Sequence, residues 1–292
     1  MRVLRIGGWT RAWVAACLCF AVGAASAAES LRTLDRIKVD AVIRIGYRSG
    51  AAPFSFKERD GSVRGYSAEL CTRIADALQK RLGLSALKIA WVPLDADTRL
   101  DAVVSGRVDM ECGTTTISLS RYEKVDFSLP IFIDGGSVLT SEASRIERFA
   151  DFGGKKIAVI PGTTTEGAIK RQLEVLGARA ELVPVKDGAE GIAVLTQGKV
   201  DGYAGDRIVL VALRSMAASP EKLRLLDSDF SFEPYALVVR RDDPDFRLAV
   251  NRALVGLYRS GDIDTIFHRW LGGLGQPGPL LNAMFYLSTL PE

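Results

Sequence analysis

Short apolar runs and amphipathic helical patterns alternate along this chain, and the alternation occurs twice. In the first part, apolar runs at 42–46, 87–92 and 108–112 alternate with helical patterns at 67–82 and 98–105. In the second part, apolar runs at 156–160, 180–185 and 200–204 alternate with helical patterns at 165–176 and 189–196. This alternation is typical of βαβ units, so we predict an α/β protein with two lobes, each built on a mostly parallel sheet.

The last third of the chain predicts a discontinuous first lobe. A strand-like run at 232–239 precedes two amphipathic helical patterns, at 245–259 and 263–270, and their apolar faces need a sheet to cover. We expect these two helices to pack on the sheet of the first lobe. The predicted organisation is lobe 1 from 28–136 and 233–272, lobe 2 from 137–232, crossovers near 130–138 and 229–235, and an irregular C-terminal strap over 273–292.

The first 27 residues have the composition of a cleaved signal peptide. Three arginines precede an apolar stretch at 13–25, and Ala25-Ser26-Ala27 matches an A-x-A cleavage site. A short membrane anchor is the alternative. Cleavage would leave 35 basic and 35 acidic residues, a balance that does not favour a nucleic-acid partner. No later apolar run is long enough to span a bilayer, so we expect a soluble periplasmic protein.

The chain offers little for metal, cofactor or nucleophilic chemistry. Two cysteines remain after the predicted cleavage, Cys71 and Cys112, and they form either one disulfide or two buried thiols. Two cysteines make no metal-site spacing, and the single histidine, His268, lies in a helical pattern near the C-terminus. Gly162 and Gly167 do not complete a dinucleotide fingerprint. We therefore predict neither a metal nor a cofactor.

Four charged residues stand where the βα pattern places functional groups. Arg48, Arg99, Arg121 and Asp206 each follow an apolar run or begin a helical one, in segments far apart in the sequence. Ligands in open α/β sheets bind at the carboxyl ends of strands. Three cations and one anion suit a zwitterion that carries an extra acidic or polar group. The pattern thus indicates a free amino acid as ligand.

The segment 161–166 joins a strand to a helix and has the sequence PGTTTE. Thr163 and Glu166 fit a capping box, and the N–H groups of a helix start favour an anion. The segment is equally compatible with a helix cap that has no ligand.

Several motifs together resemble a known family. The segments GYRSGAAPFSF, GYSAELC, DMECGTTTISLSRYEKVDFSLPIF, IPGTTTE, VDGYAGDR and EPYALVVRRDDP are similar to periplasmic amino-acid-binding proteins of ABC importers, in particular to the glutamate/aspartate-binding group. The resemblance implies a type II periplasmic-binding-protein fold, with two α/β lobes joined by two hinge crossovers and a ligand cleft between them. It also implies a monomer that delivers its ligand to an ABC permease without making or breaking a bond.

The resemblance implies a role for each candidate residue. Arg121 would bind the α-carboxylate, with contacts from Thr114 and Thr116. Thr163 and Thr164 would hold the same carboxylate from the second lobe. Asp206 would accept the α-ammonium, although an aspartate after a strand also stabilises turns. For the side chain of the ligand, the resemblance implies Arg48 and Arg99.

The charge of the ligand stays open at this point. Two guanidinium groups repel each other unless a ligand carboxylate balances them, or unless Asp95 or Asp97 does, in which case an amide would suit the pocket. Ala96 replaces a serine and Gly188 replaces a histidine that the acidic-ligand group shows, which removes donors and leaves room. We rank glutamate and aspartate first, glutamine and asparagine second, and a longer or modified acid third.

Three aromatic residues are candidates for the cleft wall: Phe54, Tyr66 and Tyr235. Aromatic residues near strand ends are more often part of a core.

Two other functions remain as alternatives. Relatives of this fold include enzymes that dehydrate or isomerise small cyclic acids, such as cyclohexadienyl dehydratase. In such an enzyme Glu69, Glu111 or Asp206 would be the acid or base. A ligand-sensing protein that acts through a partner kinase is the second alternative.

Overall fold

The computed structural model describes residues 32–291, and the predicted signal peptide lies outside this range. The described helices are α1 Thr33–Asp40, α2 Tyr66–Leu82, α3 Arg99–Val104, α4 Leu119–Tyr122, α5 Thr164–Val175, α6 Gly188–Thr196, α7 Arg207–Ser215, α8 Pro244–Ser260, α9 Asp262–Leu271 and α10 Pro279–Leu287. Short 3-10 helices lie at Glu142–Ser144, Phe149–Phe152 and Pro220–Lys222. Within the described range, no helix combines the length and the apolar character needed to cross a bilayer.

The main sheet consists of two parallel groups of strands that two long antiparallel strands connect. Its strands are β1 Val42–Tyr47, β5 Lys88–Pro93, β6 Met110–Cys112, β7 Val125–Ser141, β8 Lys156–Val159, β9 Glu181–Pro184, β10 Gly202–Asp206, β11 Leu223–Leu225 and β12 Ser231–Arg240. Their order is β5-β1-β6-β12-β7-β10-β8-β9, and β11 pairs with β7. The groups β5-β1-β6 and β10-β8-β9 are parallel, whereas β12 and β7 run antiparallel to each other and to their neighbours.

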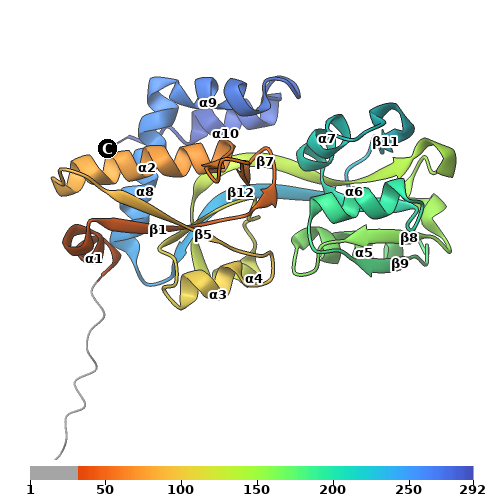
Figure 1. Ribbon diagram of the computed structural model, residues 1–292, viewed down its shortest axis with the longest axis horizontal. Helices are drawn as coiled ribbons and strands as arrows, with labels where there is room; N and C mark the ends of the chain where they lie inside the picture. The colour runs from red at the N-terminus through yellow and green to blue at the C-terminus, as the bar shows by residue number, and fades with distance from the viewer. Residues whose placement is uncertain (1–31, 292) are drawn as a thin grey trace, which may run out of the picture. The chain divides into compact units, whose positions relative to one another are not determined.

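Most of each predicted crossover is regular structure rather than loop: 130–138 lies within β7 and 231–235 within β12, whereas residues 229 and 230 precede β12. Figure 1 shows β7 and β12 running side by side from the elements around β1 to the elements around β8. Their register shifts between Tyr235 and Ala236 and again before Val238. Such irregularities bend a paired ribbon locally, which suits a connection between two separately packed parts.

Each part has its own apolar packing. Helix α2 places Leu70, Ile74 and Leu78 on one buried face, and Gly83 ends it with a φ of 65° that an L-residue rarely adopts. This face packs with α8 and α9 in the core over β1. Around β8 and β10 a second core forms under α5. The predicted α/β alternation is thus confirmed in both parts.

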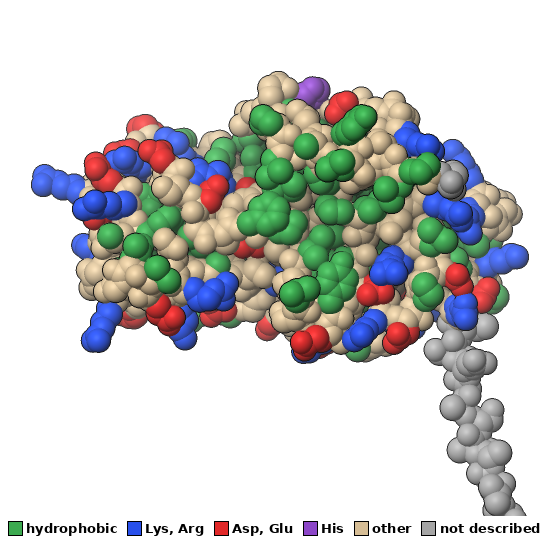
Figure 2. Space-filling view, turned by 180° about the vertical axis from the view of Figure 1, so that it is seen from behind, with side chains coloured by type: hydrophobic (Ala, Val, Ile, Leu, Met, Phe, Trp, Pro, Cys, Tyr) green, Lys and Arg blue, Asp and Glu red, His purple; other side chains and the backbone are tan. Residues whose placement is uncertain are grey.

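The tail is not irregular as predicted, because it contains helix α10. Pro279 begins the helix with a fixed φ, and Leu281, Met284 and Phe285 are buried against the first core. The sequence did not predict this helix, because glycine and proline are frequent before residue 280 and the apolar spacing that follows is short. The opposite face of the helix keeps Tyr286 and Leu287 exposed. Figure 2 shows that hydrophobic side chains gather on the back of the molecule.

A small three-stranded sheet was not predicted. It consists of β2 Gly50–Ala51, β3 Ser55–Lys57 and β4 Val63–Arg64, which are antiparallel. Strands of two or three residues leave too little alternation to be recognised in a sequence.

Cys71 and Cys112 form a disulfide, which confirms one of the two alternatives for this pair. It joins α2 to the end of β6, with the two Cα atoms 6.4 Å apart. The bond fixes the helix against the strand that leads into the segment from 113 to 116.

We predict that the disulfide contributes strongly to stability. The bond closes a loop of 41 residues, for which the chain-entropy relation gives about 4 kcal/mol. The double variant Cys71→Ala/Cys112→Ala should lose about this much free energy of unfolding in urea titrations. A reductant should destabilise the wild type to the same extent and leave the variant unchanged. Equal stability of the oxidised wild type and the variant would contradict this prediction.

Candidate functional site

Most of the predicted site residues line one small cavity. Its volume is about 50 Å³, and its lining comes from the ends of β1, β6, β8 and β10 and from the starts of α3, α5, α6 and α7. The lining includes Arg48, Arg99, Thr114, Thr116, Thr163, Thr164 and Asp206. Segments from both parallel groups of strands therefore converge on one cavity, at the strand ends where open α/β sheets bind ligands.

Arg99 is the most buried charge of the cavity, with a residue exposure of 3%. Its Nε donates to Thr115 Oγ1 at 2.8 Å, and Thr115 Oγ1 donates in turn to Glu111 Oε2 at 2.8 Å. Its Nη1 is buried and has no hydrogen-bond partner. Because a buried donor without a partner is costly, the guanidinium is only partly satisfied by the protein itself.

The electrostatics of Arg99 answer a question that the sequence left open. Burial, together with the nearby charges of Arg121 and Arg48, lowers the pKa of Arg99 to about 9, and Glu111 and Asp206 oppose the shift. Glu111, reached through Thr115, therefore balances part of the charge of the arginines. Asp95 and Asp97 are exposed and are not the counter-charges that the sequence suggested.

Arg121 lies beside the cavity and is fixed by its own chain. It belongs to the short helix α4, whose N-cap Ser118 accepts from the Arg121 N–H. Its Nη1 donates to the carbonyl oxygen of Thr116 at 2.7 Å. Burial lowers the pKa of Arg121, and Glu233, Glu111 and Asp206 counteract this. The guanidinium is thus oriented before any ligand binds.

The start of α5 brings hydroxyl groups from the other part of the chain. Thr163 is the N-cap, and its Oγ1 accepts from the N–H of Glu166. The carboxylate of Glu166 accepts from the N–H of Gly162, so only half of the predicted capping box forms. Thr164 Oγ1 lies 3.1 Å from Thr116 Oγ1, and this contact joins the segments after β6 and β8.

Asp206 ends β10 and takes one hydrogen bond from the start of α5. Thr165 Oγ1 donates to Asp206 Oδ1 at 2.8 Å. Burial and the nearby charge of Glu233 raise the pKa of Asp206 to about 6. The sequence identified Asp206, but it did not identify Thr165 or Glu233. A glutamate inside the apolar strand β12 was the available signal, because a buried charge needs partners.

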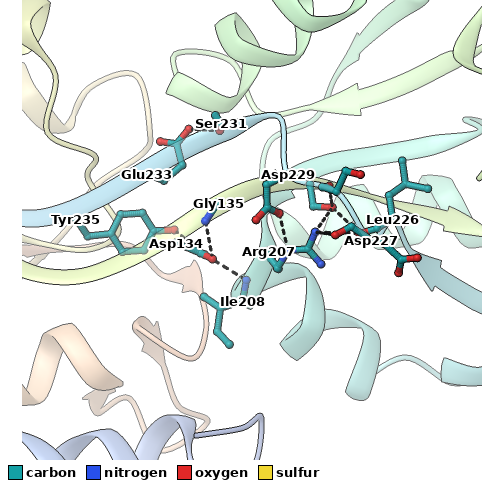
Figure 3. A network of polar contacts seen from close by, with 12 residues as sticks. Asp134, Gly135, Arg207, Ile208, Leu226, Asp227, Asp229, Ser231, Glu233 and Tyr235 are labelled. Carbon is teal, nitrogen blue, oxygen red and sulfur yellow. Dashed lines mark hydrogen bonds and ion pairs between the residues drawn. The ribbon is translucent and has the colours of Figure 1, made fainter. Parts of the chain in front are cut away.

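A second acidic centre lies next to the cavity, where β7, β12 and α7 meet. Figure 3 shows Asp134 between Tyr235 and the start of α7. Its Oδ2 accepts from Tyr235 Oη and from the Ile208 N–H, both at 3.2 Å, and its Oδ1 accepts from the Gly135 N–H. Burial and the charge of Asp206 raise the pKa of Asp134 to about 8.

The three aromatic candidates for the cleft wall lie in the core. Phe54, Tyr66 and Tyr235 are fully buried and pack edge to face, with ring centroids 5.7 Å and 5.4 Å from Phe54. They are not among the lining residues of the cavity. Their position reflects the ordinary preference of aromatic rings at strand ends for the interior.

Gly188 and Ala96 differ in what they do to the cavity. Gly188 lines it, but a Cβ at this position would come within 2.8 Å of a methyl carbon of Leu213. The space beside Gly188 is therefore taken by Leu213, rather than left free as the sequence suggested. Ala96 is buried next to a neighbouring hollow of about 330 Å³ that Asp95 and Asp97 also line.

Comparison with known proteins identifies the family. The model of the bacterial extracellular solute-binding proteins, family 3, matches residues 43–273. The L-glutamate/L-aspartate-binding protein of Pseudomonas aeruginosa is 31% identical over 83% of this chain and 80% of its own. The glutamate/aspartate import solute-binding protein of Escherichia coli K12 is 30% identical over 91% of this chain and 87% of its own. This chain therefore belongs to the bacterial extracellular solute-binding proteins, family 3.

Solved structures agree with this family. The crystal structure of the ancestral amino acid-binding protein AncCDT-1, a precursor of cyclohexadienyl dehydratase, is 28% identical and superposes with a TM-score of 0.71. The match covers 82% of this chain and 99% of that one. The fold is the type II periplasmic-binding-protein fold, as the resemblance of the motifs predicted.

The two raised aspartate pKa values predict that the ligand-free protein loses stability as the pH rises. Their pKa values are about 8 for Asp134 and about 6 for Asp206, against 3.8 ordinarily. Between these values the folded state holds protons that the unfolded chain has released, so the free energy of unfolding decreases as the pH rises. Urea unfolding between about pH 5 and about pH 8 measures this slope.

The variant Asp134→Asn should flatten that slope, most of all above about pH 6, because it removes the larger shift. The matched control is Asp76→Asn at an exposed position of α2, which should follow the wild type. A wild-type slope in Asp134→Asn would show that Asp134 is not the proton-binding group.

Proposed function

We propose that this protein binds a small polar or acidic L-amino acid and delivers it to an ABC permease. Glutamate and aspartate rank first, glutamine and asparagine second, and a longer or modified acid third. The observation that carries this proposal is the buried Nη1 of Arg99, which has no protein partner and belongs to a side chain that lines the cavity. A carboxylate or amide oxygen of the ligand would complete its hydrogen bonds.

The assigned roles follow the charges of the cavity. Arg121 takes the α-carboxylate with contacts from Thr114 and from the backbone N–H of Thr116, and the backbone N–H groups of Thr163 and Thr164 hold it from the start of α5. Asp206 takes the α-ammonium, and Arg48 and Arg99 face the distal end of the side chain. The fixed guanidinium of Arg121 and the acceptor position of Asp206 at the end of β10 support this orientation.

An acidic side chain ranks above an amide because of the charge balance. At neutral pH the guanidinium of Arg99 remains protonated, since its pKa is about 9. Glu111 is one carboxylate beside three arginines, Arg48, Arg99 and Arg121, and burial raises its pKa. A ligand carboxylate would supply the missing negative charge.

The space beside Gly188 bears on the length of the ligand. The sequence suggested free room there for a longer acid, but Leu213 takes that space. This is the reason for placing longer acids third.

Closure around the ligand is the proposed mechanism. Lobe 1 would comprise 28–136 and 233–272, lobe 2 would comprise 137–232, and the strap 273–292 would pack on lobe 1. The contact of Thr164 with Thr116 supports a cavity that both lobes complete. A ligand that contacts both sides favours the closed form through its differential contacts.

The closed protein would then dock on the membrane subunits of its permease as a monomer. Export through residues 1–27 and their removal would place it in the periplasm. The relatives named above, which are import and amino-acid-binding proteins by name, support this location.

Calorimetric titration with L-glutamate, L-aspartate, L-glutamine and L-asparagine tests the ligand. Arg121→Ala should weaken every ligand that binds by ~100-fold or more, because the α-carboxylate would be buried without its cation. Arg99→Ala should weaken acidic ligands by ~10-fold more than amides. The control Arg107→Ala, at an exposed arginine beyond α3, should bind as the wild type does.

Equal losses for acids and amides in Arg99→Ala would refute the assignment of Arg99 to the distal end. Saturable binding of none of the four amino acids would refute the ligand class.

An enzyme of the same fold is the second candidate. It is favoured by the likeness to a precursor of cyclohexadienyl dehydratase and by the raised pKa of Asp206, which suits a general acid. Glu111 is not among the lining residues of the cavity, and Glu69 is engaged by Arg269 and Trp270. Turnover of prephenate-like cyclic acids would support the enzyme, whereas stable binding of an amino acid without turnover supports the binding protein.

A further inference from the structure

One buried carboxylate connects hydroxyl groups from both sides of the cavity. Glu233 lies in β12 and has an exposure of 1%. Its Oε2 accepts from Thr116 Oγ1 and from Thr164 Oγ1, each at 2.6 Å. Its Oε1 accepts from Ser231 Oγ at 2.6 Å, and Figure 3 shows this pair on β12. Both threonines line the cavity, whereas Glu233 lies behind them.

The hydroxyl protons of Thr116 and Thr164 are therefore both donated to Glu233. A hydroxyl group has one proton to donate and two lone pairs that accept, and a carboxylate has only acceptors. Both hydroxyl protons thus point to Glu233. The contact between the two hydroxyl oxygens is longer, at 3.1 Å, so it does not compete for the Thr164 proton. Only lone pairs remain to face a ligand.

Lone pairs select one end of an amino acid. They attract an ammonium group and repel a carboxylate, and Asp206 adds a negative charge to the same cavity. The α-carboxylate must then be bound by N–H groups. The guanidinium of Arg121 and the first N–H groups of α5, which have no partners within the helix, are suited to this.

We propose that Glu233 is a positioning residue for the α-ammonium of the ligand. By taking both hydroxyl protons, Glu233 fixes Thr116 and Thr164 as acceptors toward the cavity, and it makes the site select an amino acid over the same acid without its amino group. This inference rests on the proposed function, because it concerns the same cavity and presumes an amino-acid ligand.

Three variants separate the acceptor role from packing and surface effects. Glu233→Gln keeps a carbonyl acceptor, Glu233→Met keeps the volume without the acceptor, and Glu221→Met makes the same substitution at an exposed glutamate. The probes are L-glutamate and L-glutamine, each titrated beside its analogue without the amino group, glutarate or glutaramate. A thermal melt of each variant checks folding.

Glu233→Met should weaken binding of the amino acid by ~10-fold or more, because the hydroxyls no longer present lone pairs alone. Binding of the analogue should not weaken. Glu233→Gln should retain most of the wild-type affinity, and Glu221→Met should retain all of it. Unchanged affinity in Glu233→Met, or an equal loss for the amino acid and its analogue, would overturn the proposal.

A double-mutant cycle tests whether Glu233 acts through the threonines. Thr164→Val should weaken amino-acid binding in the wild type and have a much smaller effect in Glu233→Met, since the two changes remove the same acceptor arrangement. Additive losses would overturn the proposal. If Glu233→Met does not fold, Thr164→Val and Thr164→Ser decide instead. Valine should weaken the amino acid and spare its analogue, serine should weaken neither, and any other pattern would overturn the proposal.

A failure of the proposed function gives a different result from a failure of the positioning role. If the proposed function fails, the wild type itself binds none of the amino acids. The positioning role fails when the wild type binds an amino acid and the substitutions at Glu233 do not separate it from its analogue.

Discussion

The arrangement of the site depends on holding the guanidinium group of Arg99 almost entirely out of water. An isolated charge would not remain there, because its desolvation costs several kcal/mol. The chain Arg99–Thr115–Glu111 supplies a hydrogen bond and a counter-charge from behind. The same constraint explains Gly113, where a Cβ would come within 2.3 Å of Glu111 Oε1. Glycine is therefore needed between the carboxylate and the threonines that follow.

The acidic groups of the site interact with one another around the long antiparallel strands. Burial and the charge of Glu233 raise the pKa of Asp206, and burial and the charge of Asp206 raise the pKa of Asp134. Asp134 and Glu233 lie on β7 and β12, the strands that join the two parallel groups. A change in the charge of Asp206 in the cavity therefore alters the pKa of Asp134, which lies on a strand that connects the two parts of the molecule.

Much of the fold was predictable because the sequence follows simple periodicities. The face formed by Leu70, Ile74 and Leu78 and the stop at Gly83 define α2 from the sequence alone. Helix α10 was not predictable in this way, because its short apolar spacing follows a run of glycine and proline and its partner surface is distant in sequence. The continuity of β7 across the predicted boundary near residue 137 also depends on pairings that no local pattern encodes, with β12 up to Gly136 and with β10 and β11 beyond it.

For the site, charge and position in the βα pattern selected Arg48, Arg99 and Asp206, which line the cavity, but not their partners. The sequence proposed Asp95 and Asp97 as counter-charges because they flank Arg99, whereas the structure uses Glu111 through a hydroxyl group. Glu233 was part of a recognised motif, yet two of its three hydrogen bonds come from residues 117 and 69 positions away in sequence. Contacts over such separations follow from tertiary packing and not from local spacing.

A crystal structure of the protein grown with L-glutamate tests the central claim most directly, namely that a ligand acid completes the buried guanidinium group of Arg99. The account predicts one glutamate in the cavity, with its distal carboxylate within hydrogen-bonding distance of Arg99 Nη1 and its α-ammonium at Asp206. A glutamate bound outside the cavity, or one in the cavity that leaves Arg99 Nη1 without a partner, would contradict it.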